Sequence, residues 1–163
     1  MMAAMTQTDA ARTLDDALDG LRFAMVATAG PAGEWKSRPL ALAGQEGGAL
    51  TFLVSTEAEW VAGLEVESSP TTVTFSDPGK NTYVALQGAA RTSNDRARIA
   101  ELWNVGAASY FDGKDDPTVR VLEVTVSYGE YWDGPHGRLG QAVNLLKAAL
   151  GNEDAGEQGD VRV

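Results

Sequence analysis

Hydrophobic and β-branched residues gather in six short segments of this chain, and apolar and polar positions alternate most clearly in the last one, where Leu122, Val124, Val126 and Tyr128 share one face. A period of two is typical of a strand that buries one face, and clusters of glycine, proline, aspartate and asparagine between the segments predict tight turns. The first three segments follow one another without room for crossover helices, so they predict an antiparallel meander rather than parallel βαβ units. The six predicted strands cover residues 23–28, 34–43, 50–55, 71–76, 82–92 and 119–128.

Helical spacing of apolar residues marks both ends of the chain. Residues 6–20 carry alanine and leucine at intervals of three and four, and Gly20 is placed to end that helix. A second helix is expected over residues 138–150, ahead of a polar acidic tail. The 163 residues contain no repeat and no linker-like segment, so we expect one domain, residues 1–163, with an N-terminal helix within residues 1–20 and the C-terminal helix and tail within residues 138–163.

Two further helices are expected between the strands. Thr56 and Glu59 form a T-x-x-E capping box, which predicts a helix that starts there and ends near residues 68–70. Short hairpins with helices inserted between them predict a mainly β (α+β) fold, a closed or nearly closed antiparallel barrel with peripheral helices. The other helix is expected to carry Ile99, Leu102 and Trp103. Its start can be capped by Ser93, Asn94 or Asp95.

The charge balance narrows the range of partners. The chain has 23 acidic and 13 basic side chains and a formal net charge of −10, so it should repel nucleic-acid phosphates and anionic membranes. It has no cysteine and a single histidine, His136, which argues against thiolate and multi-histidine metal sites. No segment has the ~20 apolar residues of a membrane span, and the N-terminus lacks the apolar run of a secretory signal. We therefore expect a cytoplasmic protein without a metal.

Arg38 is the most informative basic residue, because it lies inside a predicted strand of an acidic chain. An arginine in such a place is held either by a carboxylate of the protein or by a ligand phosphate, and the residues alone do not separate these two. Pro39 follows it and has no N–H for a strand ladder. It therefore predicts an edge, a bulge or a break in the strand.

Aromatic residues are concentrated in the second half of the chain. They either pack in the core and in a subunit interface or form a platform for a flat ring system. The residues concerned are Trp103, Tyr110, Phe111, Tyr128, Tyr131 and Trp132.

A series of short motifs runs through the chain in a defined order: Met25-Val26-Ala27-Thr28, Arg38-Pro39-Leu40, Leu50-Thr51-Phe52-Leu53-Val54-Ser55, Tyr83 to Ala89, Asp95, Leu102-Trp103, Asp115-Asp116-Pro117, Glu130-Tyr131-Trp132-Asp133 and Gly156-Glu157. Together, from about Leu14 to Val163, they resemble the flavin-binding split-barrel proteins related to pyridoxamine 5′-phosphate oxidase, and most of all their bacterial general stress protein branch. Each motif is weak by itself, and the combination is fairly specific.

The resemblance implies a six-stranded antiparallel split barrel and a homodimer that binds flavin mononucleotide (FMN) at the subunit interface. It also implies that Arg38 and hydroxyl groups after the third strand hold the FMN phosphate, and that aromatic residues of the second subunit complete the pocket. The residues marked in this way are Arg38, Pro39, Leu40, Phe52, Leu53, Val54, Ser55 and Thr56, with Trp103 and Trp132 supplied by the partner.

One position departs from the family pattern. Where the family has Ser-x-Lys-Val early in the helix after the third strand, this chain has Ala58-Glu59-Trp60-Val61, so Trp60 replaces the phosphate-binding lysine. A charge-assisted contact with phosphate contributes about 1.5–3 kcal/mol, so its loss weakens binding by about one to two powers of ten. Glu57 and Glu59 add negative charge nearby. FMN binding should therefore be weakened or lost, with Trp60 covering the pocket or stacking on another ring.

Two kinds of function follow from the resemblance. The first is an FMN-binding, oxidoreductase-like protein of the general stress type, in which the cofactor carries the redox chemistry. It would not be a true pyridoxamine 5′-phosphate oxidase, because the substrate phosphate would need more cations than the chain offers. The alternative is a non-enzymatic stress-response dimer that binds flavin weakly, binds another flat aromatic small molecule, or has lost its ligand. No catalytic residue can be named.

Overall fold

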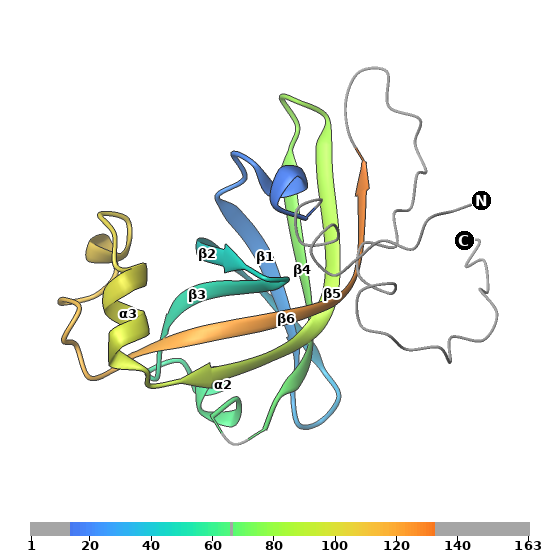
Figure 1. Cartoon of the computed structure of the whole chain (residues 1–163). Helices are drawn as coiled ribbons and strands as arrows, with labels where there is room; N and C mark the ends of the chain where they lie inside the picture. The colour runs from blue at the N-terminus through green and yellow to red at the C-terminus, as the bar shows by residue number, and fades with distance from the viewer. Residues whose placement is uncertain (1–13, 66, 133–163) are drawn as a thin grey trace.

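The computed structural model describes residues 14–65 and 67–132 (Figure 1). Six antiparallel strands close into a barrel in the order β1-β2-β3-β6-β5-β4, so β1 pairs with β4 as well as with β2. The expected mainly β barrel is confirmed, and each predicted strand is found. Their bounds are β1 Phe23–Ala29, β2 Trp35–Glu46, β3 Ala49–Ser55, β4 Ser69–Asp77, β5 Thr82–Ser93 and β6 Val119–Trp132.

The helices lie outside the barrel wall (Figure 1). The two described α-helices are α2 (Glu59–Gly63) and α3 (Arg96–Leu102), and a 3-10 turn follows at Ala107–Ser109. Residues 14–18 are also helical, and Gly20 ends that turn with a positive φ of 78°, as predicted. The earlier part of the first predicted helix, the predicted helix over residues 138–150, and His136 lie outside the described residues. Among the described residues, no helix is long and apolar enough to span a bilayer.

The barrel interior is filled by every second residue of the strands, as their period of two requires. A smaller cluster lies where α3 covers the wall, and it joins Ile99 and Leu102 to Val119 and Val121. The side chains of the main core that are almost fully buried are Leu14, Val26, Leu50, Phe52, Val61, Val73, Phe75, Val84, Leu86 and Leu122.

The capping box predicted at Thr56 and Glu59 is wrong. The N-cap of α2 is Ala58, which makes no side-chain cap, and the helix is only five residues long. The backbone N–H of Thr56 instead donates to the carbonyl oxygen of Thr118 at 2.9 Å. This bond continues the pairing of β3 with β6, so Thr56 stays with the sheet and the helix starts later. Asp95, in contrast, caps α3 as predicted and accepts a hydrogen bond of 3.0 Å from the N–H of Arg98.

β2 changes its neighbour halfway along its length. Residues 35–41 pair with β1, residues 42–46 pair with β3, and the register shifts between Leu42 and Gly44. Pro39 therefore lies in the half that has a strand on one side only, as its missing N–H predicted. The predicted turn over residues 44–48 begins too early, because β2 extends to Glu46 and the chain reverses at Gly47 and Gly48, both at positive φ.

The β5·β6 pairing contains a second irregularity that requires a glycine. The register shifts between Gln87 and Gly88, and a Cβ atom at Gly88 would collide with the carbonyl oxygen of Thr125 and approach the Cα of Val126 at 3.1 Å. Two backbones approach closely at this point, so a side chain would force the strands apart.

We predict that Gly88→Ala lowers the free energy of unfolding by about 1–3 kcal/mol, because the obstructing atoms are backbone and cannot rotate away. The matched control is Gly63→Ala, where no atom lies within 4 Å of the added Cβ. The control should be neutral or stabilising by up to about 1 kcal/mol. Urea denaturation of both variants measures the difference, and equal stabilities would contradict the close approach.

Asp116 orders the loop that leads into β6. Its carboxylate accepts hydrogen bonds of 2.8 Å from the N–H and 2.7 Å from the hydroxyl of Thr118, and these bonds hold the pKa of Asp116 below its usual value. Arg96 holds the same loop through the carbonyl oxygens of Lys114 and Asp116, at 2.8 Å and 3.0 Å.

A carboxyl with a lowered pKa in the folded state stabilises the protein above its unfolded pKa, and this contribution disappears as the pH falls through the folded pKa. Asp116→Asn should therefore lower the denaturant midpoint at pH 7 by more than at pH 3, because the contribution decreases as the pH falls below the unfolded pKa toward the lowered folded pKa. The control, Asp115→Asn, removes the same charge from an exposed neighbour and should have little effect at either pH. An Asp116→Asn effect of the same size at both pH values would contradict the assignment.

Candidate functional site

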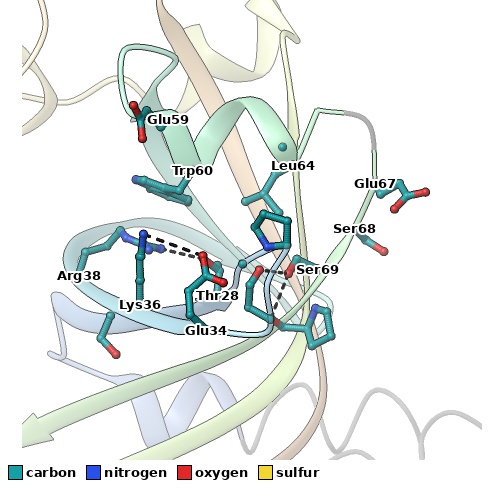
Figure 2. Close-up of a pocket in the computed structure, with 16 residues that line it drawn as sticks. Thr28, Glu34, Lys36, Arg38, Glu59, Trp60, Leu64, Glu67, Ser68 and Ser69 are labelled. Atoms are coloured by element: carbon teal, nitrogen blue, oxygen red, sulfur yellow. Dashed lines mark hydrogen bonds and ion pairs between the residues drawn. The ribbon is translucent and has the colours of Figure 1, made fainter.

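A large pocket opens between the β1–β2 hairpin, α2 and the segment that enters β4 (Figure 2). Its volume is about 1020 Å³, which is at the upper end of the range for small-molecule sites. It is lined by Thr28, Ala29, Gly30, Pro31, Glu34, Lys36, Ser37, Arg38, Glu59, Trp60, Gly63, Leu64, Glu67, Ser68, Ser69 and Pro70.

Arg38 and Trp60 both line this pocket, and their side chains stack on each other. The guanidinium carbon of Arg38 lies 4.0 Å from the centroid of the Trp60 ring, which is cation–π geometry (Figure 2). Its NH1 group donates a hydrogen bond of 3.0 Å to the hydroxyl of Thr28. Val26, on the same face of β1 as Thr28, is paired with Arg38 in the sheet. β1 and α2 thus hold the guanidinium from two sides.

The charge of Arg38 is not neutralised by the described part of the chain. No carboxylate among residues 14–65 and 67–132 forms an ion pair with it, although six such pairs occur elsewhere. Burial lowers the pKa of the Arg38 guanidinium, which nevertheless remains protonated because its reference value is so high. Of the two interpretations left open by the sequence, a carboxylate partner is thus not found among the described residues. A half-buried cation in this state is suited to an anionic ligand.

The remaining charged residues of the pocket are mainly acidic. Lys36 is the second basic residue, but its ammonium lies 4.0 Å from Glu34 and its side chain is 69% exposed. Glu59 is on α2 beside Trp60, and Glu67 points away from the pair at the far rim (Figure 2). Two basic and three acidic side chains therefore line the pocket, and only one of the basic groups is held in place.

A second, smaller groove of about 500 Å³ lies on the outer face of the barrel wall. Phe23, Met25 and Tyr83 line it and are 64%, 44% and 40% exposed, which is high for large apolar side chains. Pro39 and Trp132 complete this apolar surface. Successive strand residues point to opposite faces, so Arg38 and its neighbour Pro39 belong to different pockets.

The structure divides the predicted flavin-binding residues into separate environments. Arg38 and Trp60 meet in the large pocket. Phe52 and Val54 have side chains in the main core, at 0% and 4% exposure, and Leu40 packs against that core. None of these three side chains lines the pocket, and any contact of theirs with a ligand stays a prediction.

The other predicted residues lie elsewhere on the molecule. Leu53 and Trp103 pack against the cluster under α3, where the ring of Trp103 lies 6.1 Å from that of Phe111. The hydroxyl of Ser55 accepts a bond of 3.2 Å from the N–H of Glu57 beyond the end of β3. Thr56 follows it, and Pro39 and Trp132 share the apolar groove. Ligand contacts of these residues also stay predictions.

Thr28 and Ser69 are among the polar residues of the pocket that were not singled out as site residues from the sequence. Thr28 anchors Arg38, and the hydroxyl of Ser69 donates to the carbonyl oxygen of Ala29 at 3.0 Å, which closes the pocket floor. The period of two in β1 places Thr28 on the inner face with Val26, which was the one available signal. No sequence signal brings Ser69, forty residues away, beside Ala29. Within the described residues, no group of three or more potential metal ligands comes together.

Comparison with known proteins supports the barrel fold. Residues 9–155 match the model of a family described as pyridoxamine 5′-phosphate oxidase like. A Jannaschia protein described as a general stress protein 26 is 28% identical, with a TM-score of 0.65 and coverage of 77% of this chain and 79% of that one. No match is found among curated proteins.

Two further solved structures share the fold at lower identity. One is a Clostridium acetobutylicum protein related to general stress protein 26, at 22% identity and a TM-score of 0.64, covering 79% of this chain and 91% of that one. The other is the general stress FMN/FAD binding protein of Xanthomonas citri, at 23% identity and a TM-score of 0.64, covering 78% and 90%.

The stacking of Arg38 on Trp60 can be measured in the protein without a ligand. A double-mutant cycle with Arg38→Met and Trp60→Leu should give a coupling free energy of about 0.5–1 kcal/mol in urea denaturation, as is typical of a partly exposed cation–π pair. The cycle of Trp60→Leu with Lys36→Met is the control, since Lys36 is exposed and has no recorded contact with the indole ring. Additive effects in both cycles would contradict the stacking.

Proposed function

The chain belongs to the pyridoxamine 5′-phosphate oxidase-like family, and we propose that it is a flavin-binding homodimer of the general stress protein type with oxidoreductase-like chemistry. The observation that carries this proposal is Arg38, a half-buried cation that faces a large pocket and has no carboxylate partner in the described chain. The phosphate of a flavin nucleotide is an anion that can accept hydrogen bonds from the guanidinium. The FMN/FAD binding protein of Xanthomonas citri, which has the same fold, adds support.

The residues of the pocket fit a flavin nucleotide in two respects. The volume of about 1020 Å³ is large enough for an isoalloxazine ring and its ribityl phosphate. Arg38 would hold the phosphate, Thr28 would keep the guanidinium in place, and Trp60 would offer an aromatic face at the entrance. A bound flavin supplies hydride and electron transfer, and the role of these side chains is to bind and orient it.

A second copy of the chain is the occupant that we propose for the apolar groove. Its exposed Phe23, Met25 and Tyr83 form an apolar surface of the kind that marks subunit interfaces. Trp132, which the sequence resemblance assigns to the partner's flavin pocket, lies in this same groove. Because Arg38 and Pro39 are neighbours in β2, an interface here would lie beside the flavin site.

Flavin titration tests the ligand. The wild-type protein should bind FMN at tens of micromolar or better, and Arg38→Met should weaken binding about 10- to 100-fold, because a charge-assisted phosphate contact is lost. Arg22→Met is the matched control, since Arg22 is exposed and does not line the pocket. Absence of binding by the wild type, or equal affinities of the two variants, would overturn the proposal. Reduction of bound flavin by NADH or NADPH then separates an oxidoreductase from a passive flavin binder.

Light scattering tests the dimer. The wild type should have the mass of a dimer, and Met25→Glu should convert it to a monomer because a charge is placed in the apolar groove. Val105→Glu is the control, since Val105 is 88% exposed and lies outside the groove. A wild-type monomer would contradict the proposal and would mean that the groove is not covered by a second copy.

A further inference from the structure

The charge distribution of the Arg38 pocket is unusual for a site that holds a phosphate monoester. Near neutral pH such a phosphate carries nearly two negative charges, since its second pKa is about 6. A dianion is normally met by several cations or by a cluster of N–H donors. Among residues 14–65 and 67–132, Arg38 is the one basic group that is fixed in the pocket, and carboxylates make up most of the other charged groups that line it.

The donors that Arg38 can offer are also restricted. One face of the guanidinium is covered by the indole ring of Trp60, and NH1 is bonded to Thr28. The free edge can meet two oxygens of one phosphate. Lys36, the other basic residue among the described residues that line the pocket, is 69% exposed and its ammonium lies 4.0 Å from Glu34. In Figure 2 the neutral Trp60 ring lies directly above the Arg38 guanidinium.

The titratable groups around Arg38 come from every element that borders the pocket. They are Glu34 in the β1–β2 turn, Lys36 on β2, Glu59 on α2 and Glu67 ahead of β4, while Thr28 from β1 is neutral. Lys36 is offset by Glu34. Each additional negative charge on a ligand is therefore attracted by Arg38 and repelled by the acidic residues that line the pocket.

We propose that this pocket binds the phosphate group of its ligand as a monoanion, so that it favours a phosphodiester or a singly protonated phosphate over a dianionic monoester. The inference rests on the proposed flavin function and specifies the charge state of the ligand. Trp60 contributes to this preference in two ways: it places a neutral ring rather than a charged group beside the guanidinium, and it holds the guanidinium in position.

The test compares two ligands that differ in one ionisation. Riboflavin 5′-phosphate passes from monoanion to dianion near pH 6, whereas its phosphate monomethyl ester stays a monoanion. Calorimetric titration of the wild type at pH 5.5 and 7.5 gives the ratio of the two dissociation constants, FMN over ester. This ratio should rise about tenfold from pH 5.5 to 7.5, as expected for one additional unmatched charge. The ratio cancels the steric effect of the methyl group and the titration of protein groups common to both complexes.

Variants test whether Trp60 and the acidic residues of the pocket cause the preference for the monoanion. Trp60→Lys should lower the FMN-to-ester ratio of dissociation constants at pH 7.5 by about tenfold or more, because the lysine supplies a second cation. Trp35→Lys adds the same charge at a residue that is 54% exposed and does not line the pocket, and it should leave the ratio unchanged. Should Trp60→Lys not fold, Glu59→Gln serves the same purpose by removing a rim charge, with Glu57→Gln outside the pocket as its control.

The outcomes separate this inference from the proposed function. Flavin binding with a ratio that is constant or falls from pH 5.5 to 7.5, or equal shifts by the pocket variants and their controls, overturns the monoanion preference alone. Absence of binding by FMN, its ester and riboflavin overturns the proposed function and this inference with it.

Discussion

The positive charge of Arg38, held half-buried at the end of a β-barrel, is the constraint on which the site depends. A guanidinium in such a place needs partners for its charge, its donors and its faces. The described chain supplies a hydroxyl from Thr28 and an aromatic face from Trp60, but no carboxylate ion pair. The positive charge of the guanidinium therefore has no carboxylate partner in the described chain, and the site is suited to one anionic group.

The barrel topology makes this arrangement possible. Residues 35–41 of β2 have β1 on one side and no strand on the other, because pairing with β3 begins only after the register shift at Leu42 and Gly44. The free side leaves room for α2 to bring Trp60 over Arg38. The same alternation that turns Arg38 into the pocket turns Pro39 outward into the apolar groove. One strand segment therefore contributes to both the ligand pocket and the proposed interface.

Alternation, β-branched composition and turn residues predicted all six strands, because these signals depend on local backbone chemistry. The proline in β2 predicted an edge, a bulge or a break for the same reason, and the structure shows pairing on one side. The Thr56 capping box failed because pairing of Thr56 with Thr118 competed with a local cap. Arg38 and Trp60 were both marked as site residues, yet their stacking could not be foreseen, since it depends on how α2 lies against β2. Ser69 was missed for the same reason: its neighbour Ala29 is distant in the sequence.

The central claim is that a single fixed cation in an acidic pocket holds a phosphate with one negative charge. The most direct measurement is the pKa of the phosphate of bound FMN, read from the pH dependence of its ³¹P NMR shift. Preferential binding of the monoanion requires that this pKa rise above the value of about 6 in free solution, by about one unit for a tenfold preference. A bound phosphate with a pKa below that of free FMN would show that the site favours the dianion, and it would contradict the account.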